Sequence, residues 1–145
     1  MKPLFIATII WCILTINVSA QQKHQVTAKE KLEDLLLKKV EEVPEVKEFL
    51  EQGNHHQLII DDEPHKGFKY YVVKMGYGGD MFMTLERFCV NPKTLEVYYW
   101  DVMADDAGFS YSAIISLTKW RKLRKTALWH KPHTYKAEKL VALAN

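Results

Sequence analysis

Apolar residues follow two different spacings along the chain, and the first spacing is that of a helix. Over residues 32–43 apolar side chains recur three or four positions apart, the spacing of one buried helix face. Thr27 and Glu30 come just before this run and predict a capping box, in which each side chain hydrogen-bonds a backbone N–H of the first turn. Pro44 lacks the N–H that a continuing helix needs, so a second short helix is predicted over 44–51.

The second spacing has a period of two and predicts strands. Turns rich in Gly, Pro, Asn and Asp divide this part of the chain into short apolar runs. Four strands are predicted, over residues 57–61, 68–77, 81–90 and 95–103. The connections between them are shorter than the roughly dozen residues that a parallel crossover needs, so the sheet is expected to be antiparallel.

Beyond the strands the pattern becomes helical again. A basic helix is predicted to begin at Ser116 or Thr118 and to end near residue 126. After Pro132, a last helix over 135–143 is expected in the tail. The fold class that follows is α+β: an N-terminal helix packed on a curved, mainly antiparallel four-stranded sheet, with a C-terminal helix.

The N-terminus has the three parts of a secretion signal. Lys2 gives a positive start, residues 4–16 are almost wholly apolar, and small residues lead up to Ala20. We therefore expect residues 1–20 to be a cleavable signal peptide and the protein to be secreted or periplasmic. The apolar run is shorter than the roughly 20 residues that span a bilayer. With no second such run, no membrane association is expected after cleavage.

The remaining chain is long enough for one core. We expect a single domain over residues 21–126 and a C-terminal tail or helix over 127–145. Removal of the signal takes away Cys12 and leaves Cys89 as the one thiol, so no internal disulfide can form. Cys89 lies in an apolar strand pattern, which favours a buried core thiol over a reactive one.

Charge is unevenly distributed. Acidic residues dominate residues 21–63, whereas residues 107–145 carry eight Lys and Arg against one Glu. This basic end is interpreted as the solvated face of a helix or, alternatively, as a surface for an acidic partner. Nucleic acid is not an expected partner, because the protein is predicted to be exported and no recognition motif accompanies the basic run.

One face of the predicted sheet lacks an obvious cover. On the fourth strand Tyr99 and Asp101 point one way, while Tyr98 and Trp100 point the other, so both faces carry aromatic side chains. One helix cannot cover both faces of four strands. Either the C-terminal segments cover the second face, or that face is an interface, which leaves a dimer open.

The candidate chemistry is sparse. Asp61, Asp62 and Glu63 with His65 form the densest polar cluster, but the spacing lacks the glycine and glutamate of a calcium loop and favours a solvated turn. His130 and His133 have Pro132 between them and no third zinc ligand nearby. No nucleophile elbow, phosphate loop or Cys/His context is present. We expect no metal, no cofactor and no enzymatic activity.

Two segments carry a resemblance. Phe88 to Asp101 forms a strand, an Asn-Pro-Lys-Thr turn and a strand that ends in aromatic-Asp, and Ser116 to Lys122 is a short helix with Trp-Arg. This arrangement resembles small secreted bacterial domains of cystatin-like topology, most closely the nuclear-transport-factor-like immunity proteins and secondly the PepSY-type domains. The similarity covers roughly residues 29–122, and it does not extend to the tail or include the inhibitor loop motif of the cystatins.

The resemblance implies a binding protein that neutralises a toxin or hydrolase. Aromatic and arginine side chains dominate protein interfaces, and the candidates here are Tyr70, Tyr99, Trp100, Trp120 and Arg121. The competing interpretation is that the aromatic residues form the core and that Trp120 anchors the last helix.

Three functions follow in order of preference. The first is a secreted, non-enzymatic binding protein, with immunity or inhibition as its favoured form. The second is a small-ligand or peptide binder with a pocket between helix and sheet. The third is a small hydrolase or isomerase that would depend on Asp61, His65 or Asp101.

Overall fold

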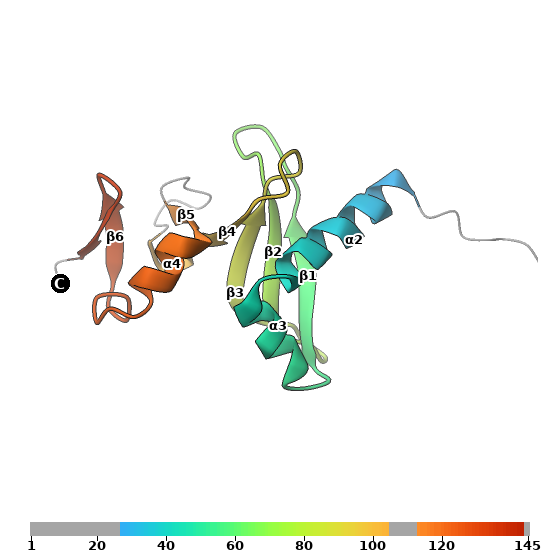
Figure 1. Ribbon diagram of the computed structural model, residues 1–145, viewed down its shortest axis with the longest axis horizontal. Helices are drawn as coiled ribbons and strands as arrows, with labels where there is room; N and C mark the ends of the chain where they lie inside the picture. Colours follow the sequence, from blue (N-terminus) through green and yellow to red (C-terminus); the bar gives the residue numbers. More distant parts are fainter. Residues whose placement is uncertain (1–26, 105–112, 144–145) are drawn as a thin grey trace, which may run out of the picture. The chain divides into compact units, whose positions relative to one another are not determined.

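The computed structural model describes residues 27–104 and 113–143 (Figure 1). The predicted signal peptide, residues 1–20, and the predicted loop over 105–112 lie outside the described residues. The chain divides into two units, Met1–Lys31 and Leu32–Asn145, and the first contributes only the start of one helix to the described part. Within that part, no helix is both long and apolar enough to cross a bilayer.

The two predicted N-terminal helices are confirmed. Helix α2 spans Ala28–Glu41 and helix α3 spans Pro44–Glu51, with the proline in the first helical turn. The capping box of α2 also forms. The Thr27 backbone N–H donates to Glu30 Oε2 at 2.5 Å, and the Glu30 N–H donates to Thr27 Oγ1 at 3.1 Å.

The strands form an antiparallel meander in chain order, as the short connections predict. The four predicted strands are observed as β1 (His56–Asp62), β2 (Tyr71–Tyr77), β3 (Met83–Val90) and β4 (Val97–Trp100). A fifth strand, β5 (Ile114–Ser116), was not predicted and pairs with β4. Three residues directly before a helix are too few to show an alternating pattern.

The end of the chain differs from the prediction. Helix α4 spans Leu117–Leu123, with the Ser116 hydroxyl accepting the Lys119 N–H as its cap, so the basic helix is confirmed but shorter. The helix predicted over 135–143 is wrong. That segment contains a hairpin of β6 (His133–Lys136) and β7 (Lys139–Ala142), joined by Ala137 and Glu138 at φ 45° and 61°. These two residues favour helices and give no turn signal.

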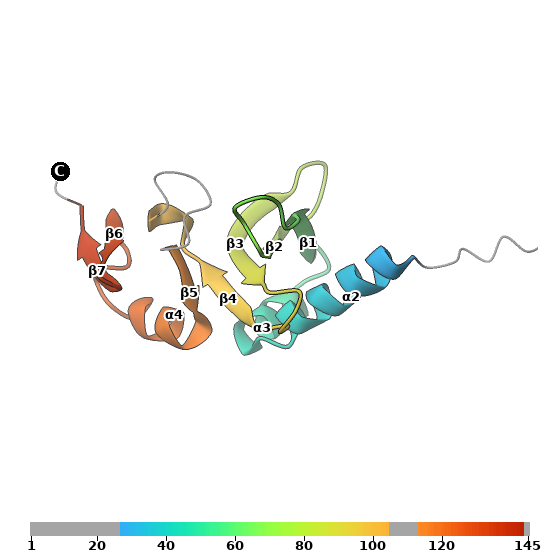
Figure 2. The same ribbon diagram turned by 90° about the horizontal axis from the view of Figure 1, so that it is seen from above.

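The three helices of the described residues pack on one face of the five-stranded sheet. Figure 2 shows α2, α3 and α4 on the same side of the strands. A single apolar cluster joins them to the sheet; its buried members are Leu36, Val40, Val43, Val46, Phe49, Tyr71, Val73, Met75, Phe88, Val90, Tyr99, Ile115 and Trp120. The α+β class is therefore confirmed, with three helices rather than one covering the core face.

The opposite face has its own smaller cluster. Its buried members are Phe68, Tyr70, Val72, Cys89, Trp100 and Ala113. Val72 and Cys89 alternate along their strands with residues of the main core, which places this cluster on the second face. Phe68 and Tyr70 precede β2, so the segment before that strand covers part of this face. Cys89 is fully buried in this cluster, as predicted for a core thiol.

Candidate functional site

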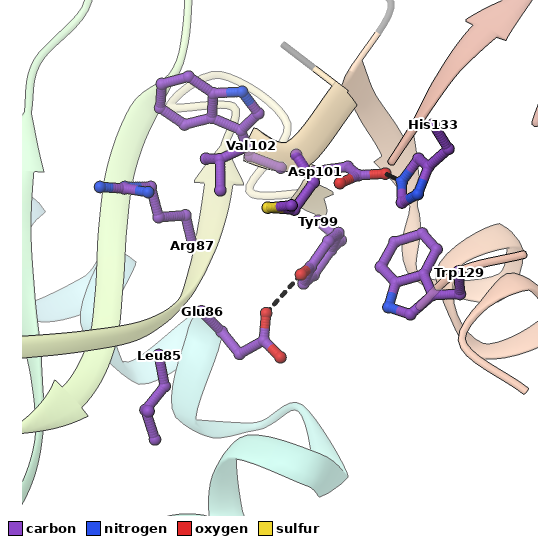
Figure 3. A pocket seen from close by; sticks show the side chains of 10 residues that line it. Leu85, Glu86, Arg87, Tyr99, Asp101, Val102, Trp129 and His133 are labelled. Atoms are coloured by element: carbon purple, nitrogen blue, oxygen red, sulfur yellow. Dashed lines mark hydrogen bonds and ion pairs between the residues drawn. The ribbon is translucent and has the colours of Figure 1, made fainter. Parts of the chain in front are cut away.

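A cavity of about 260 Å³ lies where strands β3 and β4 part (Figure 3). The two strands pair only from Phe88 to Val90, so the first half of β3 continues without β4 beside it. After Trp100 the chain leaves the sheet and turns through the 3-10 helix η1 (Val102–Ala104). The cavity is lined by Leu85, Glu86, Arg87, Tyr99, Trp100, Asp101, Val102, Met103, Trp129 and His133.

Asp101 is the centre of a buried polar cluster beside the cavity. Its side chain is 2% exposed, and its Oδ2 accepts the Tyr135 hydroxyl at 2.8 Å. The same oxygen lies 2.8 Å from His133 Nε2, and His133 is 1% exposed. Asp101, His133 and Tyr135, here called the Asp101 cluster, hold the end of β4 to strand β6. Burial, and then the hydrogen bond to Asp101, raises the pKa of Tyr135, so its hydroxyl keeps the proton that it donates.

Both ring nitrogens of His133 are engaged within the protein. Nδ1 lies 2.6 Å from the Lys131 carbonyl oxygen, which can only accept, so this nitrogen donates. Nε2 faces the Asp101 carboxylate. A general base needs a nitrogen within hydrogen-bond reach of its substrate, and His133 offers none in this arrangement. The Asp101 cluster is therefore suited to fixing the wall of the cavity.

Glu86 and Tyr99 form a second polar pair in the cavity (Figure 3). The Tyr99 hydroxyl donates to Glu86 Oε2. Burial raises the pKa of the Glu86 carboxyl, and the hydrogen bond from Tyr99 opposes that rise only in part. Burial and the neighbouring Glu86 also raise the pKa of Tyr99, so its hydroxyl stays protonated. Glu86 is thus a titratable group with a perturbed pKa that lines the cavity.

Three apolar side chains border the cavity and are open to solvent. Leu85 is 45% exposed, Val102 is 39% exposed and Met103 is 65% exposed. These residues, here called the cavity rim, come from β3 and η1. Exposed large apolar side chains gathered around a hollow are more informative than the same residues scattered singly over a surface.

Four of the five predicted contact residues are buried. Tyr70, Tyr99 and Trp100 are each 7% exposed, and Trp120 is 4% exposed. Tyr99 and Trp100 line the cavity, Tyr70 belongs to the cluster on the second face, and Trp120 stacks on Tyr99 at 4.7 Å between ring centroids. The burial favours the core interpretation of these aromatic residues, while their part in binding stays a prediction.

Arg121 is the fifth predicted contact residue and is partly exposed. Its guanidinium binds the Glu45 carboxylate through two hydrogen bonds, Nε to Oε1 at 2.7 Å and an Nη to Oε2 at 2.8 Å. Arg124 lies 3.5 Å from the same carboxylate. Helix α4 is thereby tied to helix α3. The hydrogen bond from Arg121 lowers the pKa of Glu45, more than burial raises it.

The Glu45–Arg121 pair makes stability depend on acidity. Because the folded pKa of Glu45 lies below its ordinary value of 4.5, the stabilisation is present above that value and is lost as pH falls through the lowered pKa. We expect Glu45→Gln to lower the free energy of unfolding by about 1 kcal/mol at neutral pH, since the pair is partly exposed. Urea unfolding at neutral and acidic pH measures this, and the difference from wild type should shrink in acid.

The control for this prediction is Glu42→Gln. Glu42 pairs with Lys39 on one exposed helix turn, at 2.6 Å, and does not link two helices. Glu42→Gln should lower the free energy of unfolding by less than Glu45→Gln does. A Glu45→Gln deficit that persists unchanged in acid would show that the charge of Glu45 does not act as described.

The residues of the predicted polar turn do not form one site with Asp101. Asp61 pairs with Lys74 at 2.5 Å, and His65 Nε2 lies 3.5 Å from Asp62. Asp101 instead meets His133 and Tyr135. In residues 27–104 and 113–143, no three His, Cys, Asp or Glu side chains are grouped so that they could hold a metal ion.

Sequence reasoning missed the partners that complete the cavity. Glu86, Trp129 and Tyr135 were not singled out, and His133 was considered only with His130. Glu86 faces the core side of β3, where the alternating pattern predicts an apolar residue. A charged residue at such a position is unusual, and this was the one signal in the sequence that pointed to Glu86. Nothing local in the sequence links Asp101 to Tyr135, which lies 34 residues away.

No protein family, curated protein or solved structure matches this chain. The functional proposal therefore depends on the chemistry of the cavity and its rim.

Proposed function

We propose that the protein is a secreted or periplasmic, non-enzymatic binding protein that acts on another protein, with neutralisation of a toxin or hydrolase as its favoured role. The observation that carries this proposal is the exposed apolar rim, Leu85, Val102 and Met103, around one cavity. Apolar side chains on a water-exposed rim gain free energy when a partner covers them. A hollow surrounded by such residues also supplies the shape that an anchoring side chain of a partner fits.

The polar groups of the cavity support binding rather than catalysis. The buried oxygen and nitrogen atoms of the Asp101 cluster are hydrogen-bonded to each other. Among the described residues, no side-chain nitrogen or oxygen that is fully buried lacks a hydrogen-bond partner. Groups that already satisfy one another give a rigid wall, and a rigid wall lowers the entropic cost of binding.

The test is affinity capture with a matched pair of variants. The full chain, tagged at its C-terminus, is recovered from the cell fraction in which it is found, and its bound proteins are identified by mass spectrometry. We expect one dominant partner that survives high salt, because an apolar contact is not screened. Leu85→Asp should abolish the capture, since it puts a charge on the cavity rim.

Leu35→Asp is the matched control for Leu85→Asp. Leu35 lies on α2 and is 39% exposed, against 45% for Leu85, so both changes place an aspartate at a half-exposed leucine. The control should retain the partner. Loss of the partner in both variants, or in neither, would contradict docking at the cavity rim.

A second candidate function is favoured by the cavity itself. Its volume of about 260 Å³ is close to the lower end, about 300 Å³, of ordinary ligand pockets. The protein would then be a small-ligand or peptide binder of the exported compartment. Thermal stabilisation by a small ligand, together with the absence of any protein partner, would favour this candidate.

A further inference from the structure

Glu86 has one carboxylate oxygen without a partner in the described part of the chain. Its Oε2 accepts the Tyr99 hydroxyl, and no second hydrogen bond of Glu86 is present there. No fully buried polar atom of the described side chains is unpaired, so the second oxygen is not fully buried. Figure 3 shows the carboxyl group beside the Tyr99 ring, on the lining of the cavity.

Within residues 27–104 and 113–143, no ion pair compensates the charge of Glu86. Arg124 on α4 lowers the pKa of Glu86 only weakly, and it lies 3.5 Å from Glu45 and over the Trp120 ring. The Asp101 charge, at the end of β4, acts in the opposite direction. Burial dominates, so the ionised carboxyl is held in an environment that disfavours it. A cation brought into the cavity would supply the missing counter-charge.

The cation within the cavity lining is directed elsewhere. The guanidinium of Arg87 lies over the Trp100 ring, 5.9 Å from the centroid. Figure 3 shows it pointing away from the Glu86 carboxyl. Adjacent residues of a strand point to opposite faces, which explains why Glu86 and Arg87 diverge. Arg87 therefore does not supply a positive charge to the Glu86 side of the cavity.

Aromatic rings form the wall next to Glu86. Tyr99 and Trp129 lie with their centroids 5.7 Å apart at an angle of 55°, and His133 stacks on Trp129 at 5.3 Å. An ammonium or guanidinium group is attracted to the face of Trp and Tyr rings, most strongly where water is excluded. The rim residue Met103 adds apolar surface for an alkyl stem.

We propose that this cavity binds an organic cation, a primary ammonium or guanidinium group on an alkyl stem, with Glu86 as its counter-ion and the partly exposed Trp129 ring, which packs against the buried Tyr99, as its aromatic wall. The volume of about 260 Å³ suits a group the size of one side chain. The inference deepens the proposed function. The cation is a Lys or Arg side chain of the protein partner or, for the second candidate function, a free amine.

The test is a titration of the full protein with n-butylammonium, followed by the Trp129 indole N–H signal in NMR spectra. n-Butanol has the same stem without the charge, and butyrate has the opposite charge. We expect n-butylammonium to shift the Trp129 signal and to bind at least about tenfold more tightly than either control. Equal binding of n-butanol, or no saturable shift with n-butylammonium, would overturn the proposal.

Glu86→Gln isolates the charge. Glutamine keeps an oxygen that accepts the Tyr99 hydroxyl, and it removes a buried carboxyl, so the variant should fold. We expect it to bind n-butylammonium at least about tenfold more weakly. Glu96→Gln is the matched control, because Glu96 accepts the Tyr98 hydroxyl at 2.9 Å in an exposed Tyr–Glu pair. Its affinity should equal that of wild type, and equal affinities for both variants would overturn the role of Glu86.

The binding should also depend on pH in one direction. The cation needs ionised Glu86, whose pKa is raised, so affinity should increase as pH rises through that pKa and then level off. Glu86→Gln should remove this dependence. A wild-type affinity that does not change between about pH 4 and pH 8 would contradict the assignment of Glu86 as the counter-ion.

The source of the cation is distinguished by a second ligand. Nα-acetyl-lysine-N-methylamide carries the same ammonium between two peptide groups. Tighter binding than n-butylammonium supports a side chain of a protein partner, and weaker binding supports a free amine. If no cation binds while partner capture still depends on Leu85, this inference fails and the proposed function stands. If cations bind and no partner is found, the proposed protein partner fails instead.

Discussion

Asp101→Ala should lower the free energy of unfolding by about 3–5 kcal/mol, because it removes one member of a buried, hydrogen-bonded pair. The Tyr135 hydroxyl would lose its acceptor, and the His133 ring, which is 1% exposed, would lose its carboxylate partner. Urea unfolding followed by tryptophan fluorescence measures the loss. Asp101→Asn should cost less, since the amide oxygen retains one acceptor in the same volume.

An exposed pair provides the control. Asp61→Ala also removes one partner of a close carboxylate contact, to Lys74, but the Asp61 side chain is 33% exposed. Its loss should change the free energy of unfolding by no more than about 1 kcal/mol. If Asp101→Ala cost no more than Asp61→Ala, the Asp101 cluster would not hold the hairpin of β6 and β7 to the sheet.

Trp120→Ala should be similarly damaging, with an expected loss of about 3–5 kcal/mol. Its ring is 4% exposed, stacks on Tyr99 and meets Phe88 edge-on, with centroids 6.0 Å apart. Truncation would leave a void between α4 and the sheet, beneath the aromatic wall of the cavity. Trp120→Phe should retain part of the stacking on Tyr99 and should lower the free energy of unfolding by less.

The same variants separate the two interpretations of Trp120. If Trp120 is a core residue, Trp120→Ala should lower the free energy of unfolding, and Trp120→Phe should still capture the partner. If Trp120 instead docks directly on a partner, Trp120→Phe should no longer capture the partner, while its unfolding curve stays close to that of wild type. The second result would contradict the packing described here.

Much of the fold could be predicted because its signals are local. Pro44 marks the start of α3 through its missing N–H, and the capping box of Thr27 and Glu30 marks the start of α2. Short turns impose antiparallel pairing on neighbouring strands. The hairpin of β6 and β7 could not be predicted in this way. Its turn residues, Ala137 and Glu138, are good helix formers, and its strands are stabilised by the distant Asp101.

The candidate site could be predicted only in part, because its residues are also brought together by contacts between distant segments of the chain. Asp101, Tyr99 and Trp100 were recognised as notable residues, and all three line the cavity. Their partners come from other elements. Trp129 and His133 follow α4, and the residues that bring them to Asp101 leave no periodic pattern in the sequence. Long-range contacts of this kind depend on tertiary packing, which propensity and alternation do not encode.

Contact at the cavity rim can be tested most directly through the methionine methyl groups. The chain has five methionines; Met103 lies on the rim at 65% exposure, Met75 is buried in the core at 7%, and Met81 is 86% exposed at the turn before β3. With ¹³C-methyl-labelled protein and the captured partner, we expect the Met103 signal to shift and the Met75 signal to stay in place. A bound partner that leaves Met103 unchanged while Met81 alone shifts would contradict docking at the cavity.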